Sequence, residues 1–313
     1  MDLTLIAQGL LSGVLFGGVY SLMAVGLTLI FGVMRIVNFA HGDMMVWGMY
    51  LAWLLATRLG LDPTLGFVLA AGALFVLGVL VQRGLVDRVR DAPHEMQILL
   101  LLGVGLVLEN VALVAFGPEP QRAPSSLSRV TLWLGPVFID MARLVAFTVA
   151  VALTTGLWLF LRRTDLGRTM RATADNPYGA LVVGTDVRRV YATAFGIGAA
   201  CVGAAGALVA PILPFSPSAG LPASVTSFNI VIIGGLGSLP GAFAGGLIVS
   251  VAESLGALFL SPSMKELVSF GLLILILLLR PAGLFGRRAR SRPRERRCGR
   301  GRCSSGRRPS WRC

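Results

Sequence analysis

The chain has 313 residues, of which 55% are hydrophobic and 14% are charged, and its mean hydropathy is +0.78. This composition excludes an ordinary soluble globular domain. The net charge of +13 is typical of nucleic-acid binding, but residues 281–313 hold twelve arginines and one glutamate and thus carry +11, which leaves only +2 for the rest of the chain. We therefore expect membrane lipid, and no nucleic acid, as the surroundings of residues 1–286.

Nine apolar runs follow one another along the chain. A transmembrane helix needs about 20 apolar residues to cross the hydrocarbon core, and several of the runs are short or broken by glycine. We therefore predict an all-α, polytopic transmembrane helix bundle with eight or nine spans. The runs cover residues 5–31, 44–57, 65–82, 96–116, 141–161, 191–210, 224–236, 241–260 and 267–279.

The basic residues indicate the orientation of the bundle. Cytoplasmic loops carry an excess of Lys and Arg, and alternating the loops between the two sides places 23 basic residues on one side and five on the other. Without residues 281–313 the split is still 11 to five. We expect the N-terminus outside, the C-terminus in the cytoplasm, and a disordered Arg-rich tail at 287–313.

A polar stretch interrupts the apolar pattern after the first run. Asn38, His41 and Asp43 lie within six residues, with Gly42 between the last two. We predict that these side chains satisfy the backbone of a turn or re-entrant segment at the cytoplasmic end of the first span, and that they line a substrate pathway. Turn chemistry alone accounts equally well for Asn, Gly and Asp.

Two acidic residues fall inside apolar runs. Ionisable groups within membrane spans usually face the bundle interior or water and mark functional sites. Glu109, which Asn110 follows, is predicted to mark a polar outer vestibule. Glu253 is interpreted either as a pathway residue or as a polar contact between helices.

A loop of nearly thirty residues, 162–190, separates the fifth and sixth runs on the cytoplasmic side. We predict a helix over 167–174 capped by Asp165, a break at Asn176 because Pro177 follows it, and a second helix over 177–183 that ends at Gly184. Such a structure offers a docking surface, and a surface loop without a partner is the alternative.

The stretch Gly234, Gly235, Leu236, Gly237, Ser238 separates the seventh and eighth runs. Ser238 fits the cap of the helix that follows, and a helix N-terminus attracts a carboxylate. The stretch is thus either a broken helix that holds a small polar substrate or a tight hairpin between two spans.

The chain lacks the residues of an enzyme site. Its two histidines, His41 and His94, have no cysteine or acidic partners at metal-ligand spacing, and the only lysine, Lys265, follows Met264 and not the glycine of a Walker A loop. We expect no catalytic residues, no metal and no cofactor bound by this chain. The energy for transport then comes from an ion gradient or from another subunit.

Several motifs share a resemblance to one family. Residues 35–43 (RIVNFAHGD) resemble the NFAHG signature of the permease subunits of branched-chain amino acid ABC transporters. Coverage runs from about residue 8 to 286. Further stretches that resemble the family in the same order are GGVYSL (17–22), GLTLIFG (26–32), TDLGR (164–168), MRA (170–172), GGLGS (234–238), PGA (240–242) and RPAGLFG (280–286).

The resemblance implies an inner-membrane permease domain at 1–286 that imports branched-chain amino acids. It implies as partners a similar second permease, two ATP-binding subunits that use ATP, and an extracytoplasmic substrate-binding protein. A permease for short amides or urea, and a passive channel or secondary carrier, are the alternatives. The loop 162–190 would be the segment that couples to the ATPase, through Thr164, Gly167, Arg168, Arg171, Ala172, Asn176, Ala180 and Gly184.

Two departures concern this coupling segment. Residues 177–180 (PYGA) stand where the family usually has a paired alanine, and residues 184–186 (GTD) replace a commoner Gly-Ile-Asn. They affect the expected docking geometry and not the family assignment.

Overall fold

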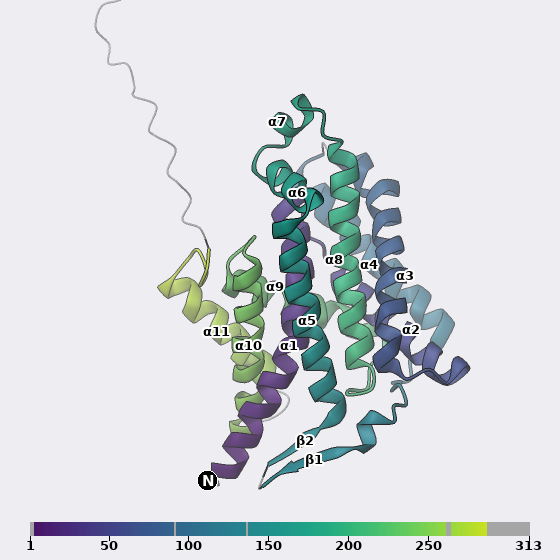
Figure 1. Ribbon diagram of the computed structural model, residues 1–313, viewed down its shortest axis with the longest axis vertical. Helices are drawn as coiled ribbons and strands as arrows, with labels where there is room; N and C mark the ends of the chain where they lie inside the picture. The colour runs from purple at the N-terminus through teal and green to yellow at the C-terminus, as the bar shows by residue number, and fades with distance from the viewer. Residues whose placement is uncertain (1–2, 91, 136, 261–263, 287–313) are drawn as a thin grey trace, which may run out of the picture.

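The computed structural model describes residues 3–90, 92–135, 137–260 and 264–286, and these residues are mostly helical, as predicted. The predicted Arg-rich tail lies outside the described residues. Six helices are long and apolar enough to cross a membrane, so the protein is a multi-pass membrane protein (Figure 1). They are α1 (Leu3–Met34), α3 (Pro63–Gly84), α4 (His94–Phe116), α5 (Met141–Arg163), α8 (Val187–Val209) and α10 (Leu239–Phe259).

Three further helices coincide with the remaining apolar runs: α2 (His41–Leu59), α9 (Gly220–Gly234) and α11 (Lys265–Leu279). The last two have 15 residues each. A helix of that length extends about 22 Å, less than the roughly 30 Å of a hydrocarbon core. The short elements are η1 (Val86–Val89), η2 (Leu127–Arg129), α6 (Asp165–Asp175), α7 (Pro177–Val182) and η3 (Pro217–Ala219).

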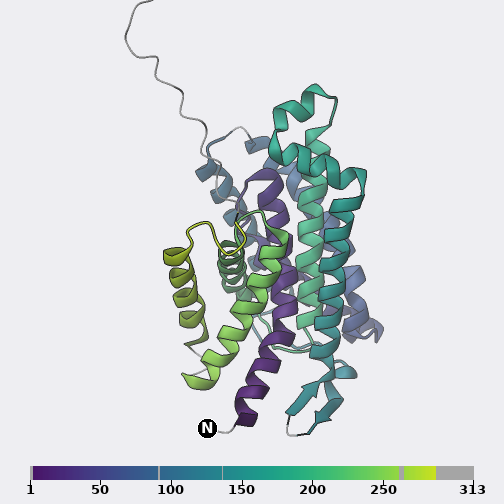
Figure 2. The same ribbon diagram turned by 60° about the vertical axis from the view of Figure 1, so that its left-hand side comes forward.

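The helices form an inverted repeat, which the sequence analysis did not detect. Helices α1, α2, α3 and α4 correspond in order to α8, α9, α10 and α11. The packing of α1 along α10 is repeated by that of α8 along α3. The contact of α2 with α8 is repeated by that of α9 with α1, and the contact of α2 with α4 by that of α9 with α11. The two halves run in opposite directions: the last residues of α1 and the first residues of the equivalent helix α8 lie at the same end of the bundle (Figure 1). Helix α5 connects them, and α11 stands beside α9 and α10 at the edge of the bundle (Figure 2).

Helices α1 and α8 form the centre of the bundle. In each of them 78% of the most apolar 18-residue window is buried, against 17% in the peripheral α4. Small residues allow backbones to approach closely in lipid: a Cβ at Gly78 of α3 would lie 3.1 Å from Gly196 Cα of α8, and one at Gly246 of α10 would lie 2.7 Å from Ser21 Cα of α1. Close packing at glycine therefore brings together α3 with α8 and, in the other half, α10 with α1.

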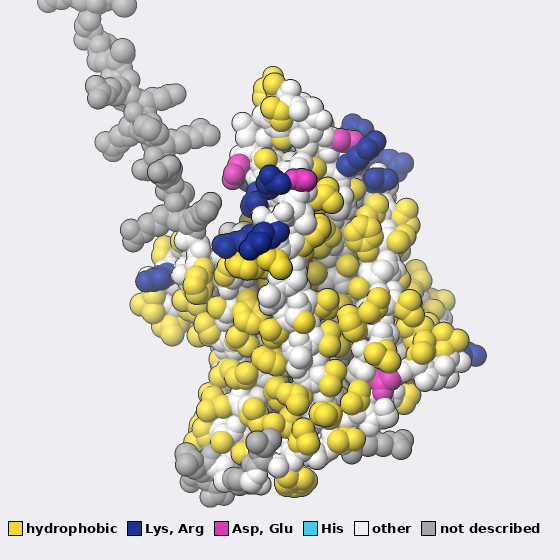
Figure 3. All heavy atoms as spheres, in the orientation of Figure 1, with side chains coloured by type: hydrophobic (Ala, Val, Ile, Leu, Met, Phe, Trp, Pro, Cys, Tyr) yellow, Lys and Arg dark blue, Asp and Glu magenta, His cyan; other side chains and the backbone are white. Residues whose placement is uncertain are grey.

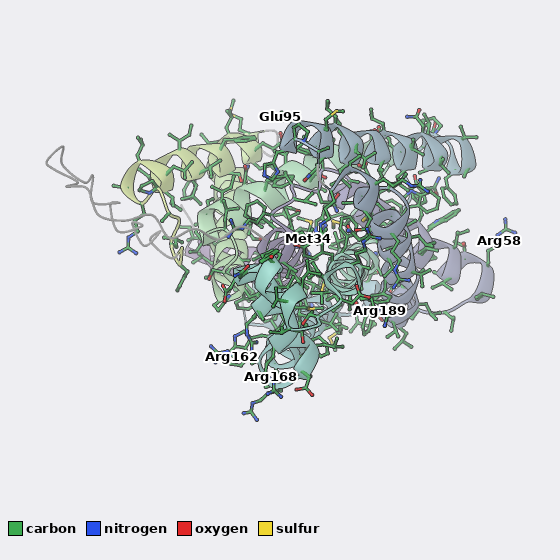
Figure 4. All side chains as sticks on the ribbon, turned by 90° about the horizontal axis from the view of Figure 1, so that it is seen from above. Met34, Arg58, Glu95, Arg162, Arg168 and Arg189 are labelled. Carbon is green, nitrogen blue, oxygen red and sulfur yellow. The ribbon has the colours of Figure 1, made fainter. Side chains whose placement is uncertain are left out.

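The two ends of the bundle differ in charge. Helices α6 and α7 project beyond it at one end, which we call the α6 end, and the first residues of α1 lie at the other, the N-terminal end (Figure 1). Dark blue Lys and Arg side chains gather toward the α6 end of the face in Figure 3, and yellow apolar side chains cover the middle. Seen from above the α6 end, Met34 lies centrally, whereas Arg162, Arg168 and Arg189 lie farther out (Figure 4).

A β-hairpin at the N-terminal end departs from the predicted all-α fold. Strand β1 (Thr131–Leu134) pairs antiparallel with β2 (Val137–Asp140), with Trp133 opposite Phe138. The side chain of Gln8 donates to Phe138 O at 2.9 Å and accepts from Phe138 N at 3.1 Å, which ties the hairpin to α1. The residues are aromatic and β-branched on either side of a glycine turn, a pattern typical of strands.

A hydrogen-bonded group at the same end, which we call the Asp62 cluster, begins α3. The Asp62 carboxylate caps the helix by accepting from Thr64 N at 3.0 Å and Thr64 Oγ1 at 2.7 Å, and it accepts from Ser126 Oγ at 2.7 Å and Ser125 Oγ at 3.1 Å. Partial burial raises the pKa of Asp62, but these hydrogen bonds together outweigh it and lower the pKa below its ordinary value.

Candidate functional site

The first polar stretch forms a re-entrant segment. Helix α1 ends at Met34, Arg35 adopts a left-handed φ of +56°, and residues 36–40 lead back into the bundle. Helix α2 then begins at His41, whose Nε2 lies 3.0 Å from Met23 O of α1. Met23 is eleven residues before Met34, about 16 Å along the helix. Helix α2 therefore starts deep in the bundle, and not at the end of the first span as predicted.

A second short helix begins at the same place. Helix α8 ends at Val209, residues 210–219 turn back, and α9 starts at Gly220 against the start of α2. One hydroxyl joins the two helix starts: Ser224 Oγ donates to Phe39 O at 2.7 Å and accepts from Gly42 N at 2.8 Å. The N-terminal ends of α2 and α9, helices of 19 and 15 residues, thus meet inside the bundle.

Glycines make this junction possible. A Cβ on Gly42 would overlap Gly220 O and lie 2.5 Å from Ser224 N, and a Cβ on Gly220 would overlap the Asp43 carboxylate. On α4, a Cβ on Gly105 would lie 2.5 Å from Asp43 Oδ2. The side chain of Asp43 is consequently enclosed by backbone from α9 and α4.

The three polar side chains of the stretch differ in their hydrogen bonds. Asn38 Oδ1 accepts from Ala40 N at 3.1 Å, as predicted for a turn, whereas His41 contacts α1 and not the turn. All three side chains are buried. Within the described residues, Asn38 Nδ2 and His41 Nδ1 have no hydrogen-bond partner. Buried polar atoms without partners are costly, so these two are candidates for contact with water or a bound ligand.

The two intramembrane acids lie in different places. Glu109 is one helical turn beyond Gly105, which packs against the Asp43 carboxylate, and lies on the same face of α4. Glu253 of α10 accepts a hydrogen bond from Tyr20 Oη of α1 at 3.1 Å. Glu253 therefore makes the predicted polar contact between helices, and Glu109 joins the site of Asp43.

Two cavities flank α9. The first, of about 290 Å³, lies between α9, α10 and α11, and we call it the acidic cavity; its polar lining consists of Glu253, Glu266, Ser269, Asn229 and Thr226. The second, of about 410 Å³, lies between α1, the re-entrant segment and α9 toward the α6 end, and we call it the apolar cavity. Its lining includes Leu27, Phe31, Phe39, Phe228 and Leu236. Val225 and Asn229 line both cavities.

The stretch 234–241 forms a tight hairpin between α9 and α10 at the α6 end, which was one of its two predicted interpretations. Gly235 and Gly237 have φ of +100° and +82°, and Ser238 Oγ caps α10 by accepting from Gly241 N at 3.2 Å. The chain beyond α11 returns to this hairpin, because Leu284 N donates to Ile233 O at 2.9 Å and Phe285 N to Gly234 O at 3.1 Å.

The loop 162–190 folds into two helices beyond the bundle. Thr164, and not Asp165 as predicted, caps α6, and its Oγ1 accepts a hydrogen bond from Gly167 N at 3.1 Å. The prediction was wrong by one residue because α6 already begins at Asp165, and the cap residue precedes the first helical residue. Asn176 caps α7 as expected from the predicted break, accepting from Gly179 N at 2.9 Å, and Gly184 follows α7 with φ +84°.

Comparison with known proteins identifies the family. Residues 9–277 match the family described as branched-chain amino acid transport system / permease component. The chain belongs to this permease family. It is 32% identical to the high-affinity branched-chain amino acid transport system permease protein BraD of Pseudomonas aeruginosa, over 90% of this chain and 95% of that protein.

Two further relatives have similar coverage. The permease protein LivH of the corresponding Escherichia coli system is 32% identical over 90% of this chain and 95% of its own. A probable LivH of Methanocaldococcus jannaschii is 27% identical over 87% and 90%. No solved structure matches the chain.

The coupling residues implied by the resemblance have distinct places in this permease. Gly167 packs against Leu161 of α5, and Arg171 donates to the Leu161 carbonyl, so that both attach α6 to the bundle. Ala180 is buried, whereas Arg168 and Ala172 are exposed. Thr164, Asn176 and Gly184 shape the ends of the two helices.

The sequence analysis missed two groups of residues in this permease. At the tip of α7, Tyr178 is 77% exposed and Val182 73%, and Leu181 and Val183 are also exposed. On α9, Ser224 and Asn229 are buried at the junction and between the cavities. The sequence signals for them were an apolar cluster in a loop predicted to be cytoplasmic, and polar residues within an apolar run.

Proposed function

We propose that this protein is the membrane-spanning permease subunit of an ABC importer that carries branched-chain amino acids across the bacterial inner membrane. The observation that supports this most strongly is the family match over residues 9–277 together with relatives of the same length that carry this name. The buried polar junction inside an otherwise apolar bundle agrees with a conduit for small polar solutes. The chain itself would then be no enzyme and bind no cofactor, and partner subunits would use the ATP.

The proposed topology has nine crossings. Helices α2 and α9 each complete a crossing with the irregular segment that precedes them, residues 35–40 and 210–219, and α11 supplies the ninth. Irregular backbone is tolerated at membrane depth where protein surrounds it, and most residues of both segments are buried or half-buried. The positive charge at the α6 end supports a cytoplasmic α6 end, with the N-terminus outside and residue 286 inside.

The proposed pathway follows α9. The acidic cavity lies toward the outer side and the apolar cavity toward the cytoplasm, and Asn229 stands between them. The junction of α2 and α9, with Asn38, His41, Asp43 and Glu109, lies beside this path. The pathway roles of Gly234, Gly235, Gly237 and Ser238 remain predictions, and Leu236 brings their hairpin to the cytoplasmic mouth of the apolar cavity.

The proposed coupling surface is the exposed side of α6 and α7. The apolar tip at Tyr178 and Val182 fits a hydrophobic groove on an ATP-binding subunit, because exposed apolar patches outside a membrane mark protein interfaces. The complex would contain a second homologous permease, forming a heterodimer, with two ATP-binding subunits and an extracytoplasmic substrate-binding protein. Movement of each ATP-binding subunit would reach the bundle through α6, which Gly167 and Arg171 attach to α5.

The test is uptake by the reconstituted complex. Liposomes containing this permease, its partner permease and the ATP-binding subunits should accumulate labelled leucine only with binding protein outside and ATP inside. Accumulation by this chain alone, without a nucleotide-hydrolysing subunit, would contradict the proposal. Uptake of urea or acetamide in place of leucine would keep the transport mechanism and change the cargo.

A further inference from the structure

The acidic cavity combines buried charge with an apolar wall. Glu253 and Glu266 both line it, and Glu253 is 8% exposed. A buried carboxylate is expensive in an apolar bundle unless a partner compensates it. The single described hydrogen bond to Glu253 comes from Tyr20, a neutral hydroxyl on the α1 side. Lys265, at the start of α11, forms no ion pair with Glu253 among the described residues, so the carboxylate still favours a positively charged group in the cavity.

The polar residues around Glu253 leave hydrogen-bonding capacity for such a group. Ser269 Oγ is buried beside the Glu253 carboxylate and makes no hydrogen bond within the described residues, and Asn229 is 5% exposed. Both line the same cavity. An ammonium group has three donors, which match the Glu253 carboxylate, the Ser269 hydroxyl and the Asn229 amide oxygen.

The other residues that line the acidic cavity favour an organic ammonium group over a metal ion. No group of three or more His, Cys, Asp or Glu residues in the described part of the chain is arranged to hold a metal ion. Leu221, Val225 and Phe270 instead supply apolar contacts, and about 290 Å³ is at the small end of ligand-pocket volumes. This combination suits a small amphiphile with one amino group and an aliphatic body.

We propose that the acidic cavity is an outward-side binding site for the primary ammonium group of an aliphatic amino acid, with Glu253 as its charged anchor. The inference rests on the proposed function, which it deepens by assigning the group that recognises cargo within the membrane. Asn229 places this site next to the apolar cavity, where the aliphatic body of the cargo can continue.

The experiment measures binding of tritiated L-leucine to the purified complex of both permeases and ATP-binding subunits in lipid nanodiscs, without the binding protein. Isopentylamine, which keeps the ammonium group, should compete, and 4-methylpentanoate, which lacks it, should not. Glu253→Gln should weaken binding by about tenfold to a hundredfold, the range of a hydrogen bond to a charged group. Glu119→Gln, in an exposed loop residue, should leave it unchanged.

A second variant separates the charge from the helix contact. Tyr20→Phe removes the hydrogen bond between α1 and Glu253 and keeps the carboxylate, so leucine binding should persist. Unchanged leucine affinity in Glu253→Gln, or equal competition by 4-methylpentanoate, would overturn the inference. If Glu253→Gln does not assemble, Ser269→Ala decides: a loss of at least twofold supports the site, and unchanged affinity overturns it.

The two proposals fail separately. Absence of leucine binding to the wild-type complex, combined with ATP-driven leucine uptake in the complete system, overturns the ammonium site and leaves the transport function intact. Absence of both overturns the proposed cargo as well.

Discussion

Replacing Gly42 with alanine tests the junction between the starts of α2 and α9. The added Cβ would overlap Gly220 O and lie 2.5 Å from Ser224 N and 2.7 Å from Ser224 Oγ, where ordinary contacts exceed 3.4 Å. The obstacles are mainly backbone atoms, which cannot rotate away. Helices α2 and α9 must therefore separate, and the bridge through Ser224 is disturbed.

The expected cost combines two terms. Overpacking in a tight core costs about 1–3 kcal/mol, and loss of the two Ser224 hydrogen bonds costs about 1 kcal/mol each. Gly42→Ala should thus destabilise the protein by about 3–5 kcal/mol. At about 2–4 °C per kcal/mol, the melting temperature should fall by roughly 6–20 °C.

A matched control is Gly72→Ala in α3, where nothing lies within 4 Å of an added Cβ. Alanine is favoured over glycine in a helix by about 1 kcal/mol, so this control should melt at or slightly above the wild-type temperature. The assay is fluorescence-detected thermal unfolding of the purified permease in detergent. If Gly42→Ala and Gly72→Ala melt alike, the tight contact between the two helix starts does not exist.

Three further changes test other parts of the structure. Arg35→Gly should stabilise the protein by about 1 kcal/mol in the same melting assay, because glycine adopts the φ of +56° without strain; a lower melting temperature would contradict that reason. The lowered pKa of Asp62 means that its cluster stabilises the fold above the unfolded pKa of about 4, and that this contribution is lost as the pH falls through the folded pKa. The melting-temperature advantage of wild type over Asp62→Ala should therefore shrink between pH 6 and pH 3, and a constant difference would show that the charge is irrelevant. Val182→Asp at the α7 tip should reduce co-purification of ATP-binding subunits at least tenfold and leave the permease folded, whereas Val130→Asp, in an exposed residue at the other end, should not.

Among the described residues, the six long apolar helices could be predicted because lipid imposes a minimum apolar length on a spanning helix. The re-entrant start of α2 was partly visible, since Asn38 and Gly42 are turn residues. The start of α9 was not predicted, because what places it is the contact of Gly220 with Gly42 and Asp43, residues far away in the sequence. The helix propensities of neighbouring residues carry no information about such a long-range contact.

The remaining discrepancies have similar causes. The stretch 234–241 fitted both a broken helix and a hairpin, and only the pairing of residues 284 and 285 with its backbone distinguishes them. The inverted repeat escaped detection because the two halves share close backbone approaches, as at Gly78 and Gly246, and not a common string of residues. The apolar tip of α7 was visible in the sequence, but its exposure depends on how α6 is held by Leu161.

The meeting of α2 and α9 at a single hydroxyl also has a mechanical meaning. Ser224 sits near the start of α9, and the two cavities share Val225 and Asn229 on the same helix. A small tilt of α9 about Ser224 would narrow one of the two cavities and widen the other. Under the proposed function, such a tilt of α9 would open one cavity only by closing the other.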